Sequence, residues 1–257
     1  MLDEQTHQKL ISLKLFGMAQ AFQLYLDQGA DNRLPFEERF GLMVDREFQE
    51  RNQRKLQVKL GRARLREPAC LEDVNYRHPR GLDKSVMQRL STCQWIQRHQ
   101  NILLTGPTGI GKTWLACALA NQACREGYSA QYFRVPRMLH DLGMARADGS
   151  WSRVFKRLAK ADVLLLDDWG VAPLTDPERR ELLEIVEERH GRRATVITSQ
   201  LPVEKWHGYI GEATLADSIL DRLVHNAHRL KLKGPSVREK LLEESEDETE
   251  NQKPKRS

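Results

Sequence analysis

The residues whose types and spacing most clearly predict chemistry match the pattern G-x-x-x-x-G-K-T: Gly106, Pro107, Thr108, Gly109, Ile110, Gly111, Lys112 and Thr113. An apolar run precedes them and an Ala- and Leu-rich segment follows, so the pattern lies where a strand, a loop and a helix would succeed one another. Glycines in such a loop let the backbone turn tightly and point its N–H groups at an anion. The sequence therefore predicts a phosphate-binding loop.

Two side chains at the end of this pattern could act on a nucleotide. Lys112 would reach the β- and γ-phosphates, and the Thr113 hydroxyl would bind Mg²⁺, a small hard cation that prefers oxygen ligands. We expect Lys112 to face solvent as long as no nucleotide is bound. The alternative is a glycine-rich turn with a surface lysine, and the agreement of motif and context argues against it.

A pair of carboxylates, Asp167 and Asp168, follows the apolar run Val163 to Leu166. Four apolar residues in a row fit a buried parallel strand, and ligands of open α/β sheets bind beyond the carboxyl ends of strands. Asp167 would hold Mg²⁺, directly or through water, and Asp168 would orient or deprotonate an attacking water. Combined with the phosphate loop, this pair predicts nucleotide hydrolysis.

Polar residues also end a second β-branched run, where Ser199 and Gln200 follow Thr198. They could sense the γ-phosphate or position water, or they could merely cap the strand, and both interpretations stay open. Arg222 lies within a predicted helix and has the spacing of an ordinary surface residue.

Seven basic residues and no acidic residue occur between Arg51 and Arg66. Five of them recur at intervals of three or four and would share one helix face: Arg51, Lys55, Lys59, Arg62 and Arg66. A generic charge run is usually a solvated helix face. Because acidic partners are missing here and a nucleotide motif is present, we favour a row that tracks nucleic-acid phosphates without reading sequence, with Arg54 as a further member.

The wider pattern positions these residues in an α/β domain. Apolar periodicity predicts strands over 102–104, 130–134, 163–166, 194–198 and 228–232, alternating with helices over 114–124, 136–147, 151–160, 175–190 and 214–226. Helical patterns over 6–27 and from Phe36 onward precede a turn-rich linker. We expect three parts: a helical N-terminal domain (1–67) that binds DNA or a partner, a nucleotide-binding domain (68–240) and a disordered charged tail (241–257).

Composition excludes some classes of protein. The chain of 257 residues has a net charge of +5 and a mean hydropathy of −0.62, and no apolar run approaches the roughly 18 residues that span a bilayer. Its polar N-terminus has no signal-peptide core, so we expect a cytoplasmic protein without membrane contact. Four cysteines without a C-x-x-C pair argue against a zinc or redox site.

Five stretches of the sequence resemble the IstB-type transposition helper ATPases, close relatives of the DnaC-type helicase loaders within the AAA+ branch of P-loop ATPases. These stretches are Asn101 to Thr113, Leu164 to Gly170, Thr198 to Pro202, Ile219 to Ala227 and Lys233 to Arg238. The similarity extends from about Leu10 to Lys240. It implies an AAA+ fold with a parallel central sheet and a small all-α N-terminal domain.

The resemblance also implies a function. Members bind ATP with Mg²⁺, form homo-oligomers on double-stranded DNA and deliver target DNA to a cognate transposase. By position, the loop from Gly106 to Thr113 would bind ATP, and Asp167 and Asp168 would serve the metal and the water. Ser199 or Gln200 would be the sensor, Arg222 an arginine finger in a neighbour's site, and Arg238 a second phosphate-sensing arginine.

Two departures from the family pattern bear on the rate and the sensor. Asp168 stands where most AAA+ ATPases have Glu, which implies slow hydrolysis stimulated by DNA or a partner, and Gln200 stands where Asn is more usual. A helicase loader and an ATP-gated DNA-binding scaffold with little hydrolysis remain alternatives.

Overall fold

The computed structural model describes residues 2–27 and 34–237, so Arg238 and the predicted tail lie outside the described residues. These residues form two compact units that divide between Gly61 and Arg62, and each is considered by itself. The predicted domain limits at residues 67 and 240 stay a prediction.

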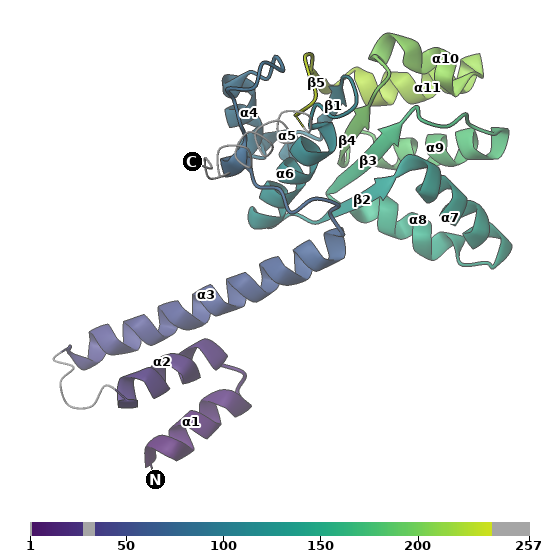
Figure 1. The fold of residues 1–257 in the computed structure, drawn as a ribbon. Coiled ribbons are helices and arrows are strands. Elements are labelled where there is room, and N and C mark those ends of the chain that lie inside the picture. Colours follow the sequence, from purple (N-terminus) through teal and green to yellow (C-terminus); the bar gives the residue numbers. More distant parts are fainter. Residues whose placement is uncertain (1, 28–33, 238–257) are drawn as a thin grey trace, which may run out of the picture. The chain divides into compact units, whose positions relative to one another are not determined.

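The N-terminal unit consists of helices α1 (Leu2–Ser12), α2 (Phe16–Asp27) and the first part of α3 (Phe36–Ala63) (Figure 1). Gly17 lets α2 approach α3 closely, because a Cβ atom there would lie 2.7 Å from the carbonyl oxygen of Arg46. The helical pattern predicted over 6–27 is divided in the structure, because α1 ends at Ser12 and α2 begins at Phe16.

A buried carboxylate joins α2 to α3 in this unit. The Glu47 side chain accepts hydrogen bonds from the backbone N–H groups of Gly17 at 2.7 Å and Met18 at 3.2 Å, which have no partner within α2. Burial would raise the pKa of Glu47, but hydrogen bonds from Arg51 and these N–H groups outweigh it and hold the pKa below its usual range.

The second unit is built on a five-stranded, all-parallel sheet in the order β2-β3-β4-β1-β5 (Figure 1). Its strands are β1 (Asn101–Thr105), β2 (Ala130–Arg134), β3 (Val163–Trp169), β4 (Ala194–Ser199) and β5 (Ala227–Lys231). Every residue of β1 and β4 is buried, as expected for central strands covered on both faces. The predicted α/β fold of the AAA+ type is confirmed.

Helices cover both faces of this sheet. Helix α6 packs on β1 to β4 and contacts α4, and the other face carries the apolar cluster that α7, α9 and α11 share with the strands (Figure 1). The helices of this unit are α4 (Lys84–Ser91), α5 (Gln94–Gln97), α6 (Lys112–Arg125), α7 (Val135–Ala147), α8 (Trp151–Lys160), α9 (Asp176–Arg189), α10 (Trp206–Ile210) and α11 (Ala213–Val224). Short 3₁₀ turns at Leu71–Asp73 and Val203–Lys205 complete the unit. Strand residues alternate between the faces, and Leu103, Leu164 and Ile197 belong to the α7–α11 side.

The predicted start of α9 is confirmed in detail. Thr175 and Glu178 form a reciprocal capping box, and Pro177 lies in the first turn.

Within the described ranges, no helix combines the length and apolar character that crossing a membrane requires.

The Glu47 contact predicts a pH dependence for the N-terminal unit. A carboxyl group whose pKa is lowered by folding stabilises the fold above its unfolded pKa, about 4.3, and loses that contribution as the pH falls through the lower folded pKa. Glu47→Gln should therefore speed hydrogen exchange of α2 amides at pH 7 and flatten their pH dependence below about 4.5. The control is Glu50→Gln, since Glu50 only pairs with exposed Arg54. Equal exchange in both variants would contradict this role for Glu47.

Candidate nucleotide site

The predicted phosphate loop connects β1 to α6 at the carboxyl edge of the sheet. Gly106, Gly109 and Gly111 have φ angles of 151°, 79° and 90°, which residues with a side chain rarely adopt. A Cβ atom at Gly106 would also lie 2.5 Å from the Leu232 carbonyl oxygen. The glycines are therefore needed for the turn and for the close approach of the chain that follows β5.

Lys112 differs from the expectation that it faces solvent. Its side chain is buried, and its ammonium donates hydrogen bonds to the carbonyl oxygens of Gly106 at 2.8 Å and Pro107 at 2.7 Å. Burial lowers the pKa of Lys112, while nearby Asp167 and Asp168 act in the opposite direction. The loop thus supplies hydrogen-bond acceptors to the ammonium of its own lysine. To contact a nucleotide, Lys112 would have to exchange these carbonyls for phosphate oxygens.

Asp167 is completely buried at the end of β3 and accepts hydrogen bonds from three elements. Its Oδ1 accepts from the hydroxyls of Thr113, at 2.8 Å, and Thr198, and its Oδ2 accepts from the Tyr132 hydroxyl at 2.7 Å. Burial raises the pKa of Tyr132, so this phenol stays a proton donor. The adjoining hydroxyl and carboxylate oxygens of Thr113 and Asp167 are the ligand types that Mg²⁺ prefers, so the residues present fit this metal.

Asp168 lies where the pairing of β3 with β4 becomes irregular, between Leu166 and Trp169. Its φ of 60° lies in the left-handed region, which residues with a side chain rarely adopt. Arg134, at the end of β2, donates a 2.6 Å hydrogen bond to Asp168. The predicted water-activating carboxylate is therefore ion-paired here.

A cavity of about 530 Å³ surrounds the loop, within the size range of ligand pockets. Among the predicted residues, it is lined by Thr108, Gly109, Gly111, Lys112, Thr113, Asp168, Ser199 and Gln200. Residues that the sequence did not indicate also line it, among them Asp73, Asn75, His78, Arg80, Trp114, Arg134, Thr198 and Val237. The segment 73–80 had been read only as a linker, and its turn residues gave no sign of a pocket.

The two candidate sensors are placed differently. The buried Ser199 hydroxyl donates to the Trp169 carbonyl at 2.7 Å and accepts from the Leu201 N–H at 3.0 Å, so it ties main-chain groups together. Gln200 is exposed at the cavity. Thr198 bonds to Asp167 directly, but the sequence placed it among the β-branched residues of the strand. The role of Ser199 or Gln200 as a phosphate sensor stays a prediction.

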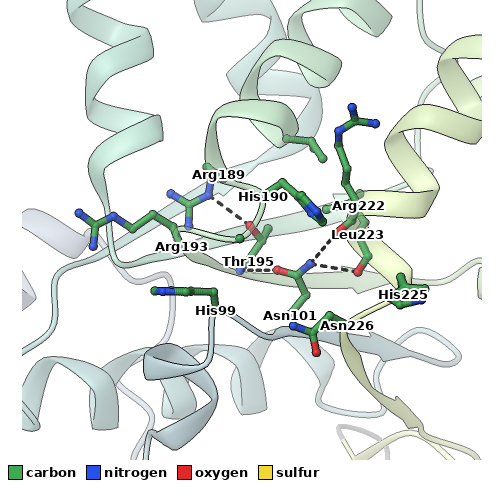
Figure 2. A pocket seen from close by; sticks show the side chains of 12 residues that line it. His99, Asn101, Arg189, His190, Arg193, Thr195, Arg222, Leu223, His225 and Asn226 are labelled. Atoms are coloured by element: carbon green, nitrogen blue, oxygen red, sulfur yellow. Dashed lines mark hydrogen bonds between the residues drawn. The ribbon is translucent and has the colours of Figure 1, made fainter.

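Arg222 lies near the amino-terminal ends of the strands, opposite to the phosphate loop, and lines a second cavity of about 420 Å³ (Figure 2). Asn101, the first residue of β1, donates to the carbonyl oxygens of Arg222 and Leu223 at 3.1 Å each and accepts from the Thr195 N–H (Figure 2). The Arg222 guanidinium pairs with Glu187 at 3.0 Å. The Arg222 carbonyl thus meets the start of β1, whereas the phosphate loop follows the other end of this five-residue strand, which spans about 16 Å.

The basic row is not one uninterrupted helix face. Arg51 and Arg54 pair with Glu47 and Glu50, acids just before the run, at 2.7 and 3.0 Å. Helix α3 ends at Ala63, so the helical spacing that placed Arg66 in the row does not extend to it, and Arg66 lines the nucleotide cavity. The contact of the basic row with DNA stays a prediction.

The sheet order, the glycine loop before α6 and the paired carboxylates near the end of β3 are those of an ATP-binding protein with an AAA+ fold. A sequence model of the family described as "IstB-like ATP binding protein" matches residues 8–245. The chain therefore belongs to the IstB-like ATP-binding proteins of insertion sequences.

Relatives support this membership. The chain is 49% identical over 238 residues to y4pL of Sinorhizobium fredii, which is named as an insertion sequence ATP-binding protein, and the match covers 93% of this chain and 97% of the relative. It is 47% identical to a protein of insertion sequence IS1162 of Pseudomonas fluorescens, over 79% and 88% of the two chains.

Solved structures show the same fold at low sequence identity. DnaI is similar with a TM-score of 0.55 and 21% identity, over 64% of this chain and 91% of DnaI. The DnaC helicase loader gives a TM-score of 0.53 at 19% identity, over 64% and 97%.

The position of Lys112 predicts the effect of removing it. Lys112→Ala should weaken ATP binding by at least roughly tenfold, because a charge-assisted contact to phosphate is lost. The Gly106 and Pro107 carbonyls also lose their donor, so the thermal unfolding midpoint should fall slightly. Nucleotide titration and thermal unfolding measure the two effects, with exposed Lys160→Ala as the control. Parent-like ATP affinity in a folded Lys112→Ala protein would refute the site.

Proposed function

We propose that this IstB-like protein is an ATP-dependent, DNA-binding regulator of transposition. It oligomerises on target DNA and delivers that DNA to a cognate transposase, and hydrolysis of ATP to ADP and phosphate drives release. The observation that carries the proposal is the convergence of Lys112, Thr113, Asp167 and Asp168 at one edge of the sheet, in a chain of an insertion-sequence family.

The site supports slow hydrolysis of ATP. Thr113 and Asp167 would hold Mg²⁺, which neutralises phosphate charge when bound. Asp168 would orient the attacking water once Arg134 releases it, because its carboxylate accepts a hydrogen bond from the Arg134 guanidinium at 2.6 Å. This ion pair supports low basal turnover that DNA or a partner stimulates.

The basic row supports contact with DNA. Lys55, Lys59 and Arg62, with Arg51 and Arg54, repeat along α3 at helical spacing. Lysine and arginine rows bind phosphates through counterion release, without reading sequence. Arg51 and Arg54 would exchange their acidic partners for DNA phosphates.

Arg222 supports assembly through ATP. In the proposed oligomer it enters the nucleotide site of a neighbouring subunit as an arginine finger, leaving Glu187. ATP then bridges two chains, and nucleotide binding favours the assembled form by mass action. Arg238, outside the described residues, stays a prediction as a second phosphate-sensing arginine.

A second candidate function is an ATP-gated DNA-binding scaffold that scarcely hydrolyses ATP. The Arg134–Asp168 ion pair is the observation that favours it, since this pair occupies the carboxylate that turnover requires. A turnover assay with and without DNA separates the scaffold from the hydrolysing regulator.

Replacing Asp168 tests the proposed hydrolysis. Asp168→Asn should bind ATP with near-parent affinity, because the loop and Asp167 are intact, and should abolish turnover. Assemblies on DNA should then persist in ATP, as followed by light scattering. The control is Asp162→Asn, which removes an Asp–Arg pair remote from the loop. DNA-stimulated turnover that survives in Asp168→Asn would assign water activation to another residue.

Mixing two inactive variants tests the arginine finger. Arg222→Ala should bind ATP but neither oligomerise on DNA nor hydrolyse ATP, and Lys112→Ala should bind ATP too weakly to hydrolyse it at concentrations that saturate the parent protein. In a mixture, some interfaces combine an intact loop with an intact Arg222, so part of the ATPase activity should return. If no ratio of the two folded variants restores activity, Arg222 does not act between subunits.

A further inference from the structure

Arg66 is a nucleotide-pocket residue that comes directly from the end of α3. The helix ends at Ala63, Arg64 takes a φ of 51°, and the Arg66 side chain then lines the cavity around the phosphate loop. Its Nη1 lies 3.8 Å from Asp167 Oδ2, and its Nε lies 3.7 Å from the Glu67 carboxylate. Both carboxylates are beyond hydrogen-bond length.

Of the residues that the structure describes, four lysine and arginine side chains line this cavity, and Arg66 has the longest distances to its carboxylate partners. Arg134 is committed to Asp168 at 2.6 Å, and Lys112 to two loop carbonyls. Arg80 is buried, with its guanidinium bonded to main-chain carbonyls at 3.3 and 3.4 Å. The Arg66 side chain is 44% exposed, so its guanidinium can turn to an anion without breaking a short ion pair.

The position of Arg66 indicates which end of a nucleotide it would meet. Thr113 bonds to Oδ1 of Asp167, and Arg66 faces Oδ2 of the same carboxylate. The Tyr132 hydroxyl lies between Asp167 and Arg66. It donates a hydrogen bond to Oδ2 of Asp167 and accepts one from the Arg66 guanidinium, which raises the pKa of Arg66. Arg66 therefore lies beside the metal and phosphate end of the site, next to Thr113.

The same short segment is tied to the sheet. Gln131 of β2 donates a 2.8 Å hydrogen bond to the Arg62 carbonyl, in the last turn of α3. The next residue, Tyr132, bonds to Asp167. The end of α3 and the buried carboxylate are thus connected through two consecutive residues of one edge strand.

We propose that Arg66 contacts the terminal phosphate of ATP, and that ATP binding thereby fixes the end of α3. The first part needs only ATP binding, while the second rests on the proposed role of the α3 row in binding DNA. The nucleotide state then reaches the DNA-binding row through Arg64 and Leu65, the two residues that lie between Ala63 and Arg66. ADP lacks the terminal phosphate and leaves this segment unfixed.

The first experiment compares ATP and ADP affinity in Arg66→Gln, Arg66→Lys and the parent protein, by titration with each nucleotide and Mg²⁺. Loss of a charged contact to phosphate should weaken ATP binding roughly tenfold to 100-fold and ADP binding much less. Arg66→Lys should recover part of the ATP affinity, because it keeps the charge without the planar guanidinium. The matched control is Arg64→Gln, an exposed arginine two residues away. An unchanged ratio of ATP to ADP affinity in Arg66→Gln would overturn the proposal.

The second experiment separates this role from DNA binding. Without nucleotide, the salt dependence of DNA binding by Arg66→Gln should equal that of the parent, whereas Lys55→Gln and Lys59→Gln should each reduce the slope by about 0.9 per lost phosphate contact. If Arg66→Gln reduces the slope and keeps its ATP affinity, Arg66 belongs to the DNA row and the proposal is wrong. A parent protein that binds no DNA would refute the proposed function but leave the ATP and ADP comparison intact.

The third measurement is hydrogen exchange at the end of α3. ATP should slow exchange of amides near Arg62 in the parent and in Arg64→Gln, and should have no such effect in Arg66→Gln. If ATP protects these amides equally in Arg66→Gln, the segment is fixed by another contact and the coupling through Arg66 is refuted.

Discussion

The rest of the nucleotide site depends on the buried carboxylate of Asp167. A charge without solvent must be compensated by hydrogen bonds, and Thr113, Thr198 and Tyr132 provide them from α6, β4 and β2. These donors can meet only if β3 lies between β2 and β4 and if the loop places α6 over the same edge. The sheet order and the position of the phosphate loop are thus tied to one side chain, and the same oxygens are available to a metal.

The edge strand β2 contacts both carboxylates of the site, Asp167 and Asp168. Tyr132 and Arg134 are two residues apart, so they point to the same face, and each meets one member of the Asp167–Asp168 pair. Parallel pairing sets Arg134 opposite Asp167 in the ladder, which brings its guanidinium within reach of Asp168. If Asp167 and Asp168 have the roles proposed for them, a small shift of β2 would act on metal binding and water activation together. An edge strand is suited to this, because only one of its sides is fixed by sheet hydrogen bonds.

The features that the sequence predicted are the local ones. The five strands, the glycine loop and the capped start of α9 follow from periodicity and turn chemistry within a few residues. The partners of the carboxylates could not be predicted, since Tyr132 and Arg134 have the ordinary pattern of an edge strand and meet Asp167 and Asp168 only across the sheet. The sequence predicts Lys112 in solvent because its motif indicates only phosphate as a partner, whereas its bonds to the Gly106 and Pro107 carbonyls depend on how the loop folds back on itself.

The placement of Arg222 constrains any assembly that uses it. The phosphate loop follows the end of β1, while Arg222 contacts Asn101 at its start, so the two halves of the proposed shared site lie at opposite edges of one sheet. A two-fold dimer pairs one patch with itself and would need both halves on a single face. Opposite edges instead favour head-to-tail contacts, which give a closed ring or an open helix according to the rotation per subunit. In the proposed assembly on DNA, subunits that share sites through Arg222 would therefore follow one another head to tail and would not pair two-fold.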